Sequence, residues 1–576
     1  MKRNILYLCL GTFLFGLAGC QEEEYVYPTV ESAGMTSVTA EILTDGVLKG
    51  EQFTCYPSST TQDTYIIPIP WYYPIESLTE TNESMFASAK LSAVLPSNVS
   101  LSPSLGIVDL RQENAYTLTE PLGTQRKITI KGERTKSSEC SILAFEIIEL
   151  GTSGIVNEDN AKVALPIPDS EDVSNVTVSL QLSYHASVAS PEGAERVDTE
   201  TMTLSGIDLT DEVVFTIKAH DGTTKNYTVK RELPNKILYG YGAGSEKGLF
   251  SLDITAFNHG NVPTLAVVEK HLVISVGDGT TPVYVARKTG ALGGQIERGD
   301  AAYNGSITSD AAGNMLIADK ANSGEVFKIY TTNAVNKVPE EFISWTNTFS
   351  ASLGDRIAAQ GDIHGDGIIV ATGSPWPGIS DGYTFVYWEI KDGVVGEPVE
   401  VSLAGTGRSW WTTVKVCPRG LKASDGFFFS YYQSGSGYFN GIAYVTVDGT
   451  QGKVASTIAE DARTYYSSNF AFDKMDAKVF NNAKYLVMTS SNHFGTWPAN
   501  DLYLFDVSNA NSITGSMDSS DALVYLYQIG SPNFPWNANI GDMVMAPTLD
   551  GYYMHIYLIN YSYNVLMGFQ IDCIQR

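Results

Sequence analysis

Apolar and polar residues alternate through most of the chain after residue 36. Segments such as RKITIKG (126–132) and VVFTIKAHDG (213–222) change character at every second residue. This is the period at which successive side chains of a β-strand point to opposite faces of a sheet. Proline, glycine, asparagine and aspartate separate these segments, and no amphipathic helix is indicated. The pattern predicts an all-β protein.

The N-terminal third contains two copies of one unit of about 95 residues. Three segments of the first copy match three of the second in the same order: 65–79 with 162–177, 99–110 with 187–198, and 123–134 with 222–232. Each copy has the strand and turn pattern of a small antiparallel sandwich. We therefore predict two tandem Ig-like β-sandwiches, at 37–134 and 137–234.

Tight-turn signals recur between apolar strands in the remainder of the chain, 235–576. Asx-Gly or Gly-Asn pairs, which supply the positive φ of hairpin turns, occur in 309–319, 362–372, 421–431 and 547–557. With the intervening hairpins, they give six four-strand units. Such a period predicts a β-propeller with six or seven blades. Residues 236–254 either close the ring or form a seventh, partial blade.

The N-terminus has the pattern of a secretory signal at 1–19. Lys2 and Arg3 precede an apolar run, 5–17, that is too short to span a bilayer. Leu17-Ala18-Gly19-Cys20 resembles the bacterial lipobox, which implies that Cys20 is lipidated and becomes the first residue of the mature chain. The residues Gln21-Glu22-Glu23-Glu24 resemble the acidic export tag of surface lipoproteins of Bacteroidota. The alternative is that 20–36 is only a solvated acidic tether.

Charge and cysteine content narrow the classes of partner. The chain has 37 basic and 64 acidic residues, a net charge of −27, which argues against nucleic acid and against charge-driven membrane binding. Membrane contact is expected through the lipid alone. Cys55, Cys140, Cys417 and Cys573 lack zinc-site spacing, so either disulfides in one of three pairings or four buried thiols are expected. No metal or cofactor is predicted.

Large aromatic residues concentrate in the predicted loops of one propeller face. With the strands of a blade named a to d outward, Trp376 and Trp497 fall in b–c loops, and Trp345, Trp410, Trp411 and Trp536 fall in d–a segments. Tyr383 and Tyr438 share these loops, whereas Trp388 lies in a strand. Such side chains could stack on sugar rings. The alternative is that they pack the loops together, with Trp410 pointing into a blade core.

Arginines form a second pattern on the same face. Arg298, Arg356, Arg408 and Arg463 lie in successive d–a segments, which would surround the mouth of a propeller channel. Converging guanidinium groups suit a carboxylate, a phosphate or a catecholate chelate. The alternative is local ion pairing with neighbouring acidic residues: Glu297, Asp300, Asp355 and Asp461.

Catalysis has little support in the sequence, and no catalytic residue is assigned. Neither a His-Glu-x-x-His nor a Gly-x-Ser-x-Gly motif is present. DIHGDG (362–367) resembles a fragment of a calcium loop but lacks the later ligands and lies at an a–b turn. Carboxylates such as Asp381 and Asp542 could pair on the aromatic face, as a glycosidase would require.

Taken together, these segments resemble outer-membrane lipoproteins of Bacteroidota nutrient-uptake (Sus-like) loci, in which Ig-like or PKD-like repeats precede a propeller-like domain. The resemblance implies a lipid-anchored protein on the outer face of the outer membrane. It would capture a glycan and pass it to a TonB-dependent transporter and its lipoprotein partners. Two alternatives remain open: binding of an anionic iron chelate, and a propeller glycoside hydrolase or lyase.

Overall fold

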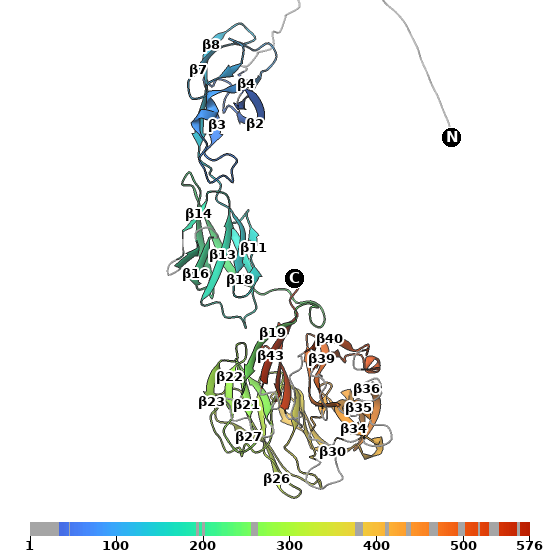
Figure 1. The fold of residues 1–576 in the computed structure, drawn as a ribbon. Helices are drawn as coiled ribbons and strands as arrows, with labels where there is room; N and C mark the ends of the chain where they lie inside the picture. Colours follow the sequence, from blue (N-terminus) through green and yellow to red (C-terminus); the bar gives the residue numbers. More distant parts are fainter. Residues whose placement is uncertain are drawn as a thin grey trace, which may run out of the picture. The chain divides into compact units, whose positions relative to one another are not determined.

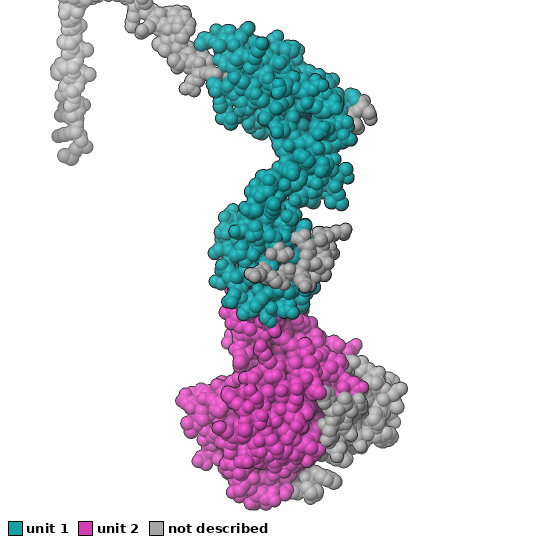
Figure 2. Space-filling model, turned by 90° about the vertical axis from the view of Figure 1, so that its left-hand side faces the viewer, with its two compact units in different colours: residues 1–164, 173–230 teal, residues 165–172, 231–576 magenta. Residues whose placement is uncertain are grey.

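The computed structural model describes residues 34–576 with gaps at 45, 190, 192–194, 199–201, 255–262, 375–383, 409, 411–413, 434–438, 460–469, 493–500, 517–518, 529–540 and 561–564. The predicted all-β fold is confirmed, because the helical segments among the described residues are short 3-10 turns: Glu83–Ala87, Ala404–Thr406, Ala423–Asp425 and Ala510–Ser512. The chain forms two compact units (Figure 2). Unit 1 comprises residues 1–164 and 173–230, and unit 2 comprises 165–172 and 231–576.

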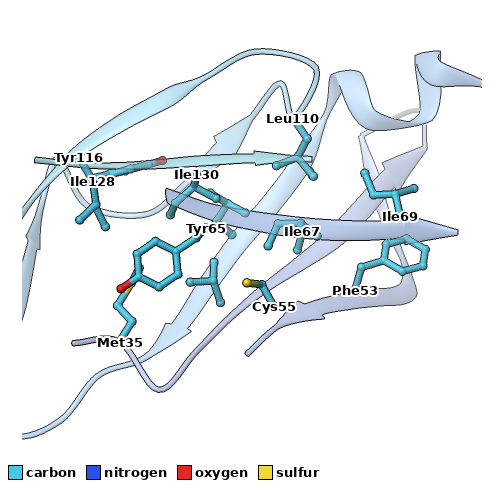
Figure 3. Packing of buried hydrophobic residues seen from close by; sticks show 14 of the residues in the cluster. Met35, Phe53, Cys55, Tyr65, Ile67, Ile69, Leu110, Tyr116, Ile128 and Ile130 are labelled. Atoms are coloured by element: carbon cyan, nitrogen blue, oxygen red, sulfur yellow. The ribbon is translucent and has the colours of Figure 1, made fainter. Parts of the chain in front are cut away.

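The first half of unit 1 contains two four-stranded sheets, β2-β1-β4-β6 and β3-β8-β7-β5. Their strands are β1 (Ser37–Thr44), β2 (Val47–Cys55), β3 (Thr64–Pro70), β4 (Ala89–Val94), β5 (Ser100–Ser102), β6 (Ile107–Val108), β7 (Asn114–Thr119) and β8 (Gln125–Thr135). Alternate residues of β3, namely Tyr65, Ile67 and Ile69, are fully buried. Figure 3 shows Ile67 and Ile69 close to Cys55 and Phe53, and all of these residues belong to one buried core.

The second half of unit 1 repeats this plan with two five-stranded sheets, β10-β9-β13-β16-β15 and β11-β12-β18-β17-β14. The strands are β9 (Ile142–Ile147), β10 (Thr152–Ser153), β11 (Ile155–Asn157), β12 (Lys162–Pro166), β13 (Val176–Leu182), β14 (Ser187–Ala189), β15 (Glu195–Asp198), β16 (Thr203–Ile207), β17 (Val213–Lys218) and β18 (Thr224–Glu232). The order β12-β18-β17-β14 corresponds to β3-β8-β7-β5. The repeated sequence segments therefore form corresponding strands.

The strands of unit 2 (Figure 1) form five hydrogen-bonded sheets, and the nine-stranded one divides into two groups of four main strands. Unit 2 therefore has six such groups, which are called sheets 1 to 6 below. Sheet 1 consists of β20 (Thr264–Val268), β21 (His271–Ser275), β22 (Val283–Ala286) and β23 (Leu292–Gln295). Sheet 2 consists of β24 (Ile307–Ser309), β25 (Met315–Ala318), β26 (Val326–Thr332) and β27 (Glu340–Thr346). Sheet 3 consists of β28 (Ile357–Gly361), β29 (Gly367–Thr372), β30 (Thr384–Lys391) and β32 (Val399–Ser402), with the short β31 (Val394–Val395) beside β30.

Sheets 4 to 6 follow the same plan. Sheet 4 consists of β33 (Cys417–Pro418), β34 (Phe427–Gln433), β35 (Phe439–Asp448) and β36 (Gln451–Ala459). Sheet 5 consists of β37 (Phe470–Phe480), β38 (Ala483–Asn492), β39 (Asp501–Asp506) and β40 (Leu523–Gln528). Sheet 6 consists of β41 (Gly541–Pro547), β42 (Tyr553–Asn560), β43 (Val565–Asp572) and β19 (Lys247–Asp253). A single bridge between Ser402 and Gln451 joins sheets 3 and 4 at their outer strands. The four predicted turn segments each connect the first and second strands of a sheet.

The six sheets form a closed, propeller-like ring. The first strands, β20, β24, β28, β33, β37 and β41, contact one another in this order, and β41 contacts β20. The fourth strand of sheet 6 is β19, which pairs antiparallel with β43 from Lys247–Gln570 to Asp253–Val565. The last sheet is therefore built from both ends of unit 2, so that this part of the predicted segment 236–254 closes the ring and makes no additional sheet.

Residues 165–172 belong to unit 2, although the first two of them are the last residues of β12. The Ser170 amide donates to Asp550 Oδ2 at 2.8 Å, and Lys288 Nζ lies 2.8 Å from Glu171 Oε2. Arg231 also donates to the carbonyls of Ile167 and Pro168. This eight-residue segment, which the sequence places inside the second Ig-like repeat, therefore belongs with unit 2.

The four described cysteines are all free and buried: Cys55, Cys140, Cys417 and Cys573. Of the two alternatives that the sequence left open, the structure has the buried thiols. Burial raises the pKa of each of them, most strongly that of Cys417. They are therefore poor nucleophiles at neutral pH.

Candidate functional site

The centre of the ring in unit 2 brings together the densest group of buried charges in the described chain. The first strand of each sheet has a neighbour on one edge only, so its other edge presents unpaired N–H and C=O groups to the ring centre. Buried backbone groups of this kind require hydrogen-bond partners. Side chains from other sheets supply them.

Two buried ion pairs lie at the ring centre: one joins Lys415, just before β33, to Asp542 of β41, and the other lies within β37. Lys415 Nζ lies 2.7 Å from Asp542 Oδ1, and both side chains are 2% exposed. Lys478 Nζ lies 3.1 Å from Asp476 Oδ2, with exposures of 0% and 1%. Burial acts to lower the pKa of Lys415, but the carboxylates of Asp542 and Asp476 outweigh it and raise that pKa. Lys415 is therefore charged.

Each member of these pairs also bonds the backbone of another sheet. Lys415 Nζ donates to the Met543 carbonyl at 2.9 Å, and Lys478 Nζ donates to the Ala359 carbonyl at 2.8 Å. Asp542 Oδ2 accepts from the Leu265 amide at 2.9 Å, and Asp476 Oδ2 accepts from the Met545 amide at 2.8 Å. The ring centre is thus a polar core that holds sheets 1, 3, 4, 5 and 6 together.

A second polar network seals the seam between sheets 1 and 6. Arg287 Nε lies 2.9 Å from His555 Nδ1, and His555 Nε2 lies 3.1 Å from Gln570 Oε1. Arginine only donates, so Nδ1 must accept and Nε2 must carry the proton. Tyr557 donates to the Arg287 carbonyl at 2.6 Å. Burial, with the charge of Arg287, lowers the pKa of His555 well below its ordinary value, so this imidazole is neutral.

This network predicts acid sensitivity of unit 2. His555 binds a proton in the unfolded chain below about pH 6.5 but not in the folded chain, so its contribution to stability is present above that pH and lost as pH falls. We expect the free energy of unfolding to drop by up to about 1.4 kcal/mol per pH unit from this residue. Denaturant titrations at pH 7 and pH 5 measure the drop. In His555→Gln the drop should be smaller, and an unchanged drop would contradict the assignment.

Three of the four predicted ring arginines are described, and they make separate contacts. Arg298 donates to the Gly279 carbonyl and Thr281 Oγ1 at 3.1 and 3.0 Å, and its guanidinium lies 5.2 Å from the Tyr303 ring centroid. Arg408 lies 5.0 Å from the Tyr431 ring centroid. Arg356 is 5% exposed and donates to the Gly541 carbonyl at 3.0 Å. No two of these three share a partner in the described contacts.

The alternative of local ion pairing is not what Arg356 shows. It donates to the carbonyl of Asp355 at 3.2 Å, whereas the Asp355 carboxylate pairs with Lys320 at 2.7 Å. Arg463 lies outside the described residues. A ligand role for the arginines therefore stays a prediction.

Most of the predicted aromatic face also lies outside the described residues: Trp376, Trp411, Trp497, Trp536, Tyr383 and Tyr438, as does the lipidation residue Cys20. Of two other tryptophans, Trp410 is a buried core residue and Trp345 is partly buried against a core cluster. Trp410 is 3% exposed, and its indole N–H donates to the Gly373 carbonyl at 3.2 Å, in agreement with the alternative of a core position. Trp345 corrects the prediction: it lies in β27, not in a connecting segment, and packs edge-on against Trp388 at 5.9 Å.

The remaining candidates for chemistry have structural partners. Asp542 is the partner of Lys415, and Asp381 lies outside the described residues. Asp362 closes the predicted turn between β28 and β29, where its Oδ1 accepts from the His364 amide at 2.9 Å. Among the described residues, no three His, Cys, Asp or Glu side chains form a possible metal site. In the same part of the chain, no helix is long and apolar enough to span a membrane.

Sequence reasoning missed the buried ion pairs, although a signal was present. Lys474, Asp476 and Lys478 occupy alternate positions of β37, so three charges share one face of a strand that begins a sheet. Lys415 likewise stands between Val414 and Val416, both buried. Charges inside an otherwise apolar first strand indicate the polar centre of a closed ring.

The ring of sheets, with its polar centre, defines unit 2 as a propeller-like all-β module. The sequence of residues 246–572 matches the family model described as a domain of unknown function, DUF8500. This range exceeds half of the chain, so the protein belongs to that family. Residues 15–132 and 142–231 match two further domains of unknown function, DUF5018 and DUF8499. A search of curated proteins gives no match.

Several solved structures are distantly similar. A DUF4623 family protein from Bacteroides eggerthii DSM 20697 is 15% identical with a TM-score of 0.40, over 76% of this chain and 99% of its own. AofleA from Arthrobotrys oligospora is 8% identical with a TM-score of 0.31, over 57% and 88%. The GH43 endo-arabinanase from Bacillus licheniformis is 8% identical with a TM-score of 0.26, over 46% and 92%. Similarities this low carry no inference about function.

Proposed function

We propose that the protein is a lipid-anchored binding protein on the outer face of the outer membrane, which captures a glycan for a TonB-dependent uptake system. Its architecture is two Ig-like β-sandwiches followed by a six-bladed β-propeller. Cys20 carries the lipid, and the two sandwiches separate the anchor from the propeller along the chain. The glycan would bind the loop face that carries Trp376, Trp497 and Trp536.

The use of the buried carboxylates favours binding over hydrolysis. Unit 2 has four buried carboxylates among its described residues, Asp310, Asp476, Asp542 and Asp572. A glycosidase needs two carboxyl groups at a fixed separation and open to substrate. Asp476 and Asp542 are each paired with a lysine and bonded to a backbone amide, as described above.

The other two have equally complete partners. Asp310 accepts from the amides of Asn314 and Ile363, and Asp572 accepts from Arg576 and the amide of Ile574. All four carboxylates therefore serve the fold. None of these four is therefore free to act on a glycan, which supports the proposal of a binding protein.

A glycan array probed with the purified chain tests the proposed function. We expect a restricted set of glycans to bind, with the bound glycans recovered intact by mass spectrometry. Recovery of shortened or unsaturated products would establish a hydrolase or lyase instead. If no glycan binds but a ferric catecholate does, the ligand class of the proposal is wrong.

The anchor has its own test. Cys20→Ser removes the only thiol of the lipobox-like segment, so we expect loss of labelled-palmitate incorporation and release of the protein from the membrane fraction. A Cys9→Ser variant is the matched control, because Cys9 lies inside the predicted signal 1–19 and should not affect the mature chain. Palmitate incorporation that persists in Cys20→Ser would exclude this anchor.

A further inference from the structure

Unit 1 contains a cavity of about 180 Å³ that lies between its two halves and is partly open to solvent. Residues from three places line it. They are the end of β3 with the residues after it, the end of β8 with the residues after it, and two histidines of the second half. The main side chains are Trp71, Tyr72, Ile75, Lys136, His185 and His220. It is smaller than the ~300–1,000 Å³ of drug-sized sites, so it has room for one small ring.

Aromatic rings form ordered walls around this cavity. Tyr72 stacks on His185 with a centroid distance of 3.7 Å and an interplanar angle of 10°. Trp71 meets His220 edge-on at 5.8 Å. His185 Nε2 lies 2.7 Å from the Ile75 carbonyl, which fixes the imidazole against the first half. The walls are therefore held in place before any ligand arrives, which lowers the ordering cost of binding.

The polar groups of the cavity favour an anion. Arg134 does not line the cavity: it lies 3.9 Å from the Trp71 ring centroid and is paired with Glu80 at 3.0 Å. Lys136 Nζ lies 5.1 Å from the same ring and has no ion-pair partner among the described residues. His220 Nδ1 is buried without a hydrogen-bond partner there. Lys136 is therefore the charged donor that lines the cavity without an ion-pair partner among the described residues.

The electrostatic surroundings of His220 point the same way. Burial, Lys136 and His185 lower its pKa, against the opposing charges of Glu80 and Asp221. Basic groups thus prevail around this imidazole. A bound cation would add to that repulsion, whereas a bound anion would relieve it.

We propose that this cavity is a second ligand site, which takes a single acidic sugar ring. The carboxylate or sulfate would bind Lys136 and His220, and the ring would lie against Trp71 and Tyr72. Aromatic faces suit the apolar faces of sugar rings, and charged donors supply strong hydrogen bonds to anionic oxygens. The site lies in unit 1, so it is independent of the loop face proposed for unit 2.

Calorimetric titration of the full chain with glucuronate, glucose 6-sulfate, glucose and inorganic sulfate tests the site. We expect at least one of the acidic sugars to bind at least about tenfold more tightly than glucose or sulfate alone. Lys136→Met should lose about tenfold in that affinity, whereas Lys131→Met, which removes a lysine within β8, should not. Equal affinities for glucose and both acidic sugars, equal losses in the two variants, or no binding would overturn the proposal.

A pH series separates recognition by His220 from a purely structural role. A bound anion favours the protonated imidazole, so the affinity for the acidic sugar should rise as pH falls from 7 to 5. His220→Gln should flatten this rise without changing the melting temperature by more than a few degrees. A rise that persists in His220→Gln would show that the imidazole does not contact the acidic group. Trp376→Ala should weaken binding on the glycan array but not binding in these titrations. The site in unit 1 and the loop face proposed for unit 2 can therefore be confirmed or excluded separately.

Discussion

Replacing Lys415 with methionine is expected to lower the free energy of unfolding of unit 2 by about 3 to 5 kcal/mol. The substitution leaves the Asp542 carboxylate, 2% exposed, without its cation. An uncompensated buried charge costs far more than the loss of one hydrogen bond, and the Leu265 amide alone cannot replace the lysine. Denaturant unfolding followed by tryptophan fluorescence measures the change.

Two further variants make this result interpretable. Lys391→Met breaks the ion pair with Asp366, whose side chains are 72% and 45% exposed, and should cost no more than about 1 kcal/mol. Adding Asp542→Asn to Lys415→Met should recover part of the loss, because the neutral amide oxygen can still accept from the Leu265 amide. If Lys415→Met costs no more than Lys391→Met, the ring centre is wet and the ion pair contributes little.

The second large effect is expected at Trp388. Its side chain is 1% exposed and lies between the Phe327 ring, stacked at 5.9 Å, and Trp345. Trp388→Ala should therefore cost about 3 to 5 kcal/mol, since the surrounding sheets cannot collapse into a cavity of that size. Thermal unfolding measures the loss, and glycan affinity of the remaining folded protein should be unchanged.

The loop tryptophans should behave in the opposite way. Trp376, Trp497 and Trp536 are each flanked by proline, which stiffens a loop and lowers the ordering cost of binding. We expect Trp376→Ala, Trp497→Ala and Trp536→Ala to leave the melting temperature almost unchanged and to weaken glycan binding by about 1 to 3 kcal/mol. Loop variants as unstable as Trp388→Ala would identify these rings as core, and the predicted binding face would be lost.

The strands and hairpins could be predicted because their signals are local. A two-residue alternation and an Asx-Gly turn depend on neighbouring residues, and DIHGDG lies between β28 and β29 as expected. The prediction places Trp345 in a connecting segment because polar residues follow it directly. In the structure β27 continues to Thr346, and the Trp345 ring packs against Trp388. The polar residues after Trp345 mark the end of the strand. They do not indicate whether the indole itself is buried.

The contacts of the ring centre could not be predicted, because they depend on which strands the closed ring brings together. Lys415 and the Met543 carbonyl are separated by 128 positions, and Asp542 and the Leu265 amide by 277. The cavity of unit 1 could not be predicted for the same reason, because residues far apart in the sequence form it. Its histidines stand alone in the sequence, and only the apposition of the two halves sets His185 on Tyr72.

The pairing of β19 with β43 has a consequence for how the chain is made. The strand β19 near the start of unit 2 pairs with β43, far later in the chain, so the ring cannot close before β43 has been synthesised. Until then β20 cannot contact β41. The exposed edges of both sheets could meanwhile associate with other chains. A chain exported through a membrane in an extended state would cross before this step is possible. Loss of β43 would leave β19 as an unpaired, aggregation-prone strand.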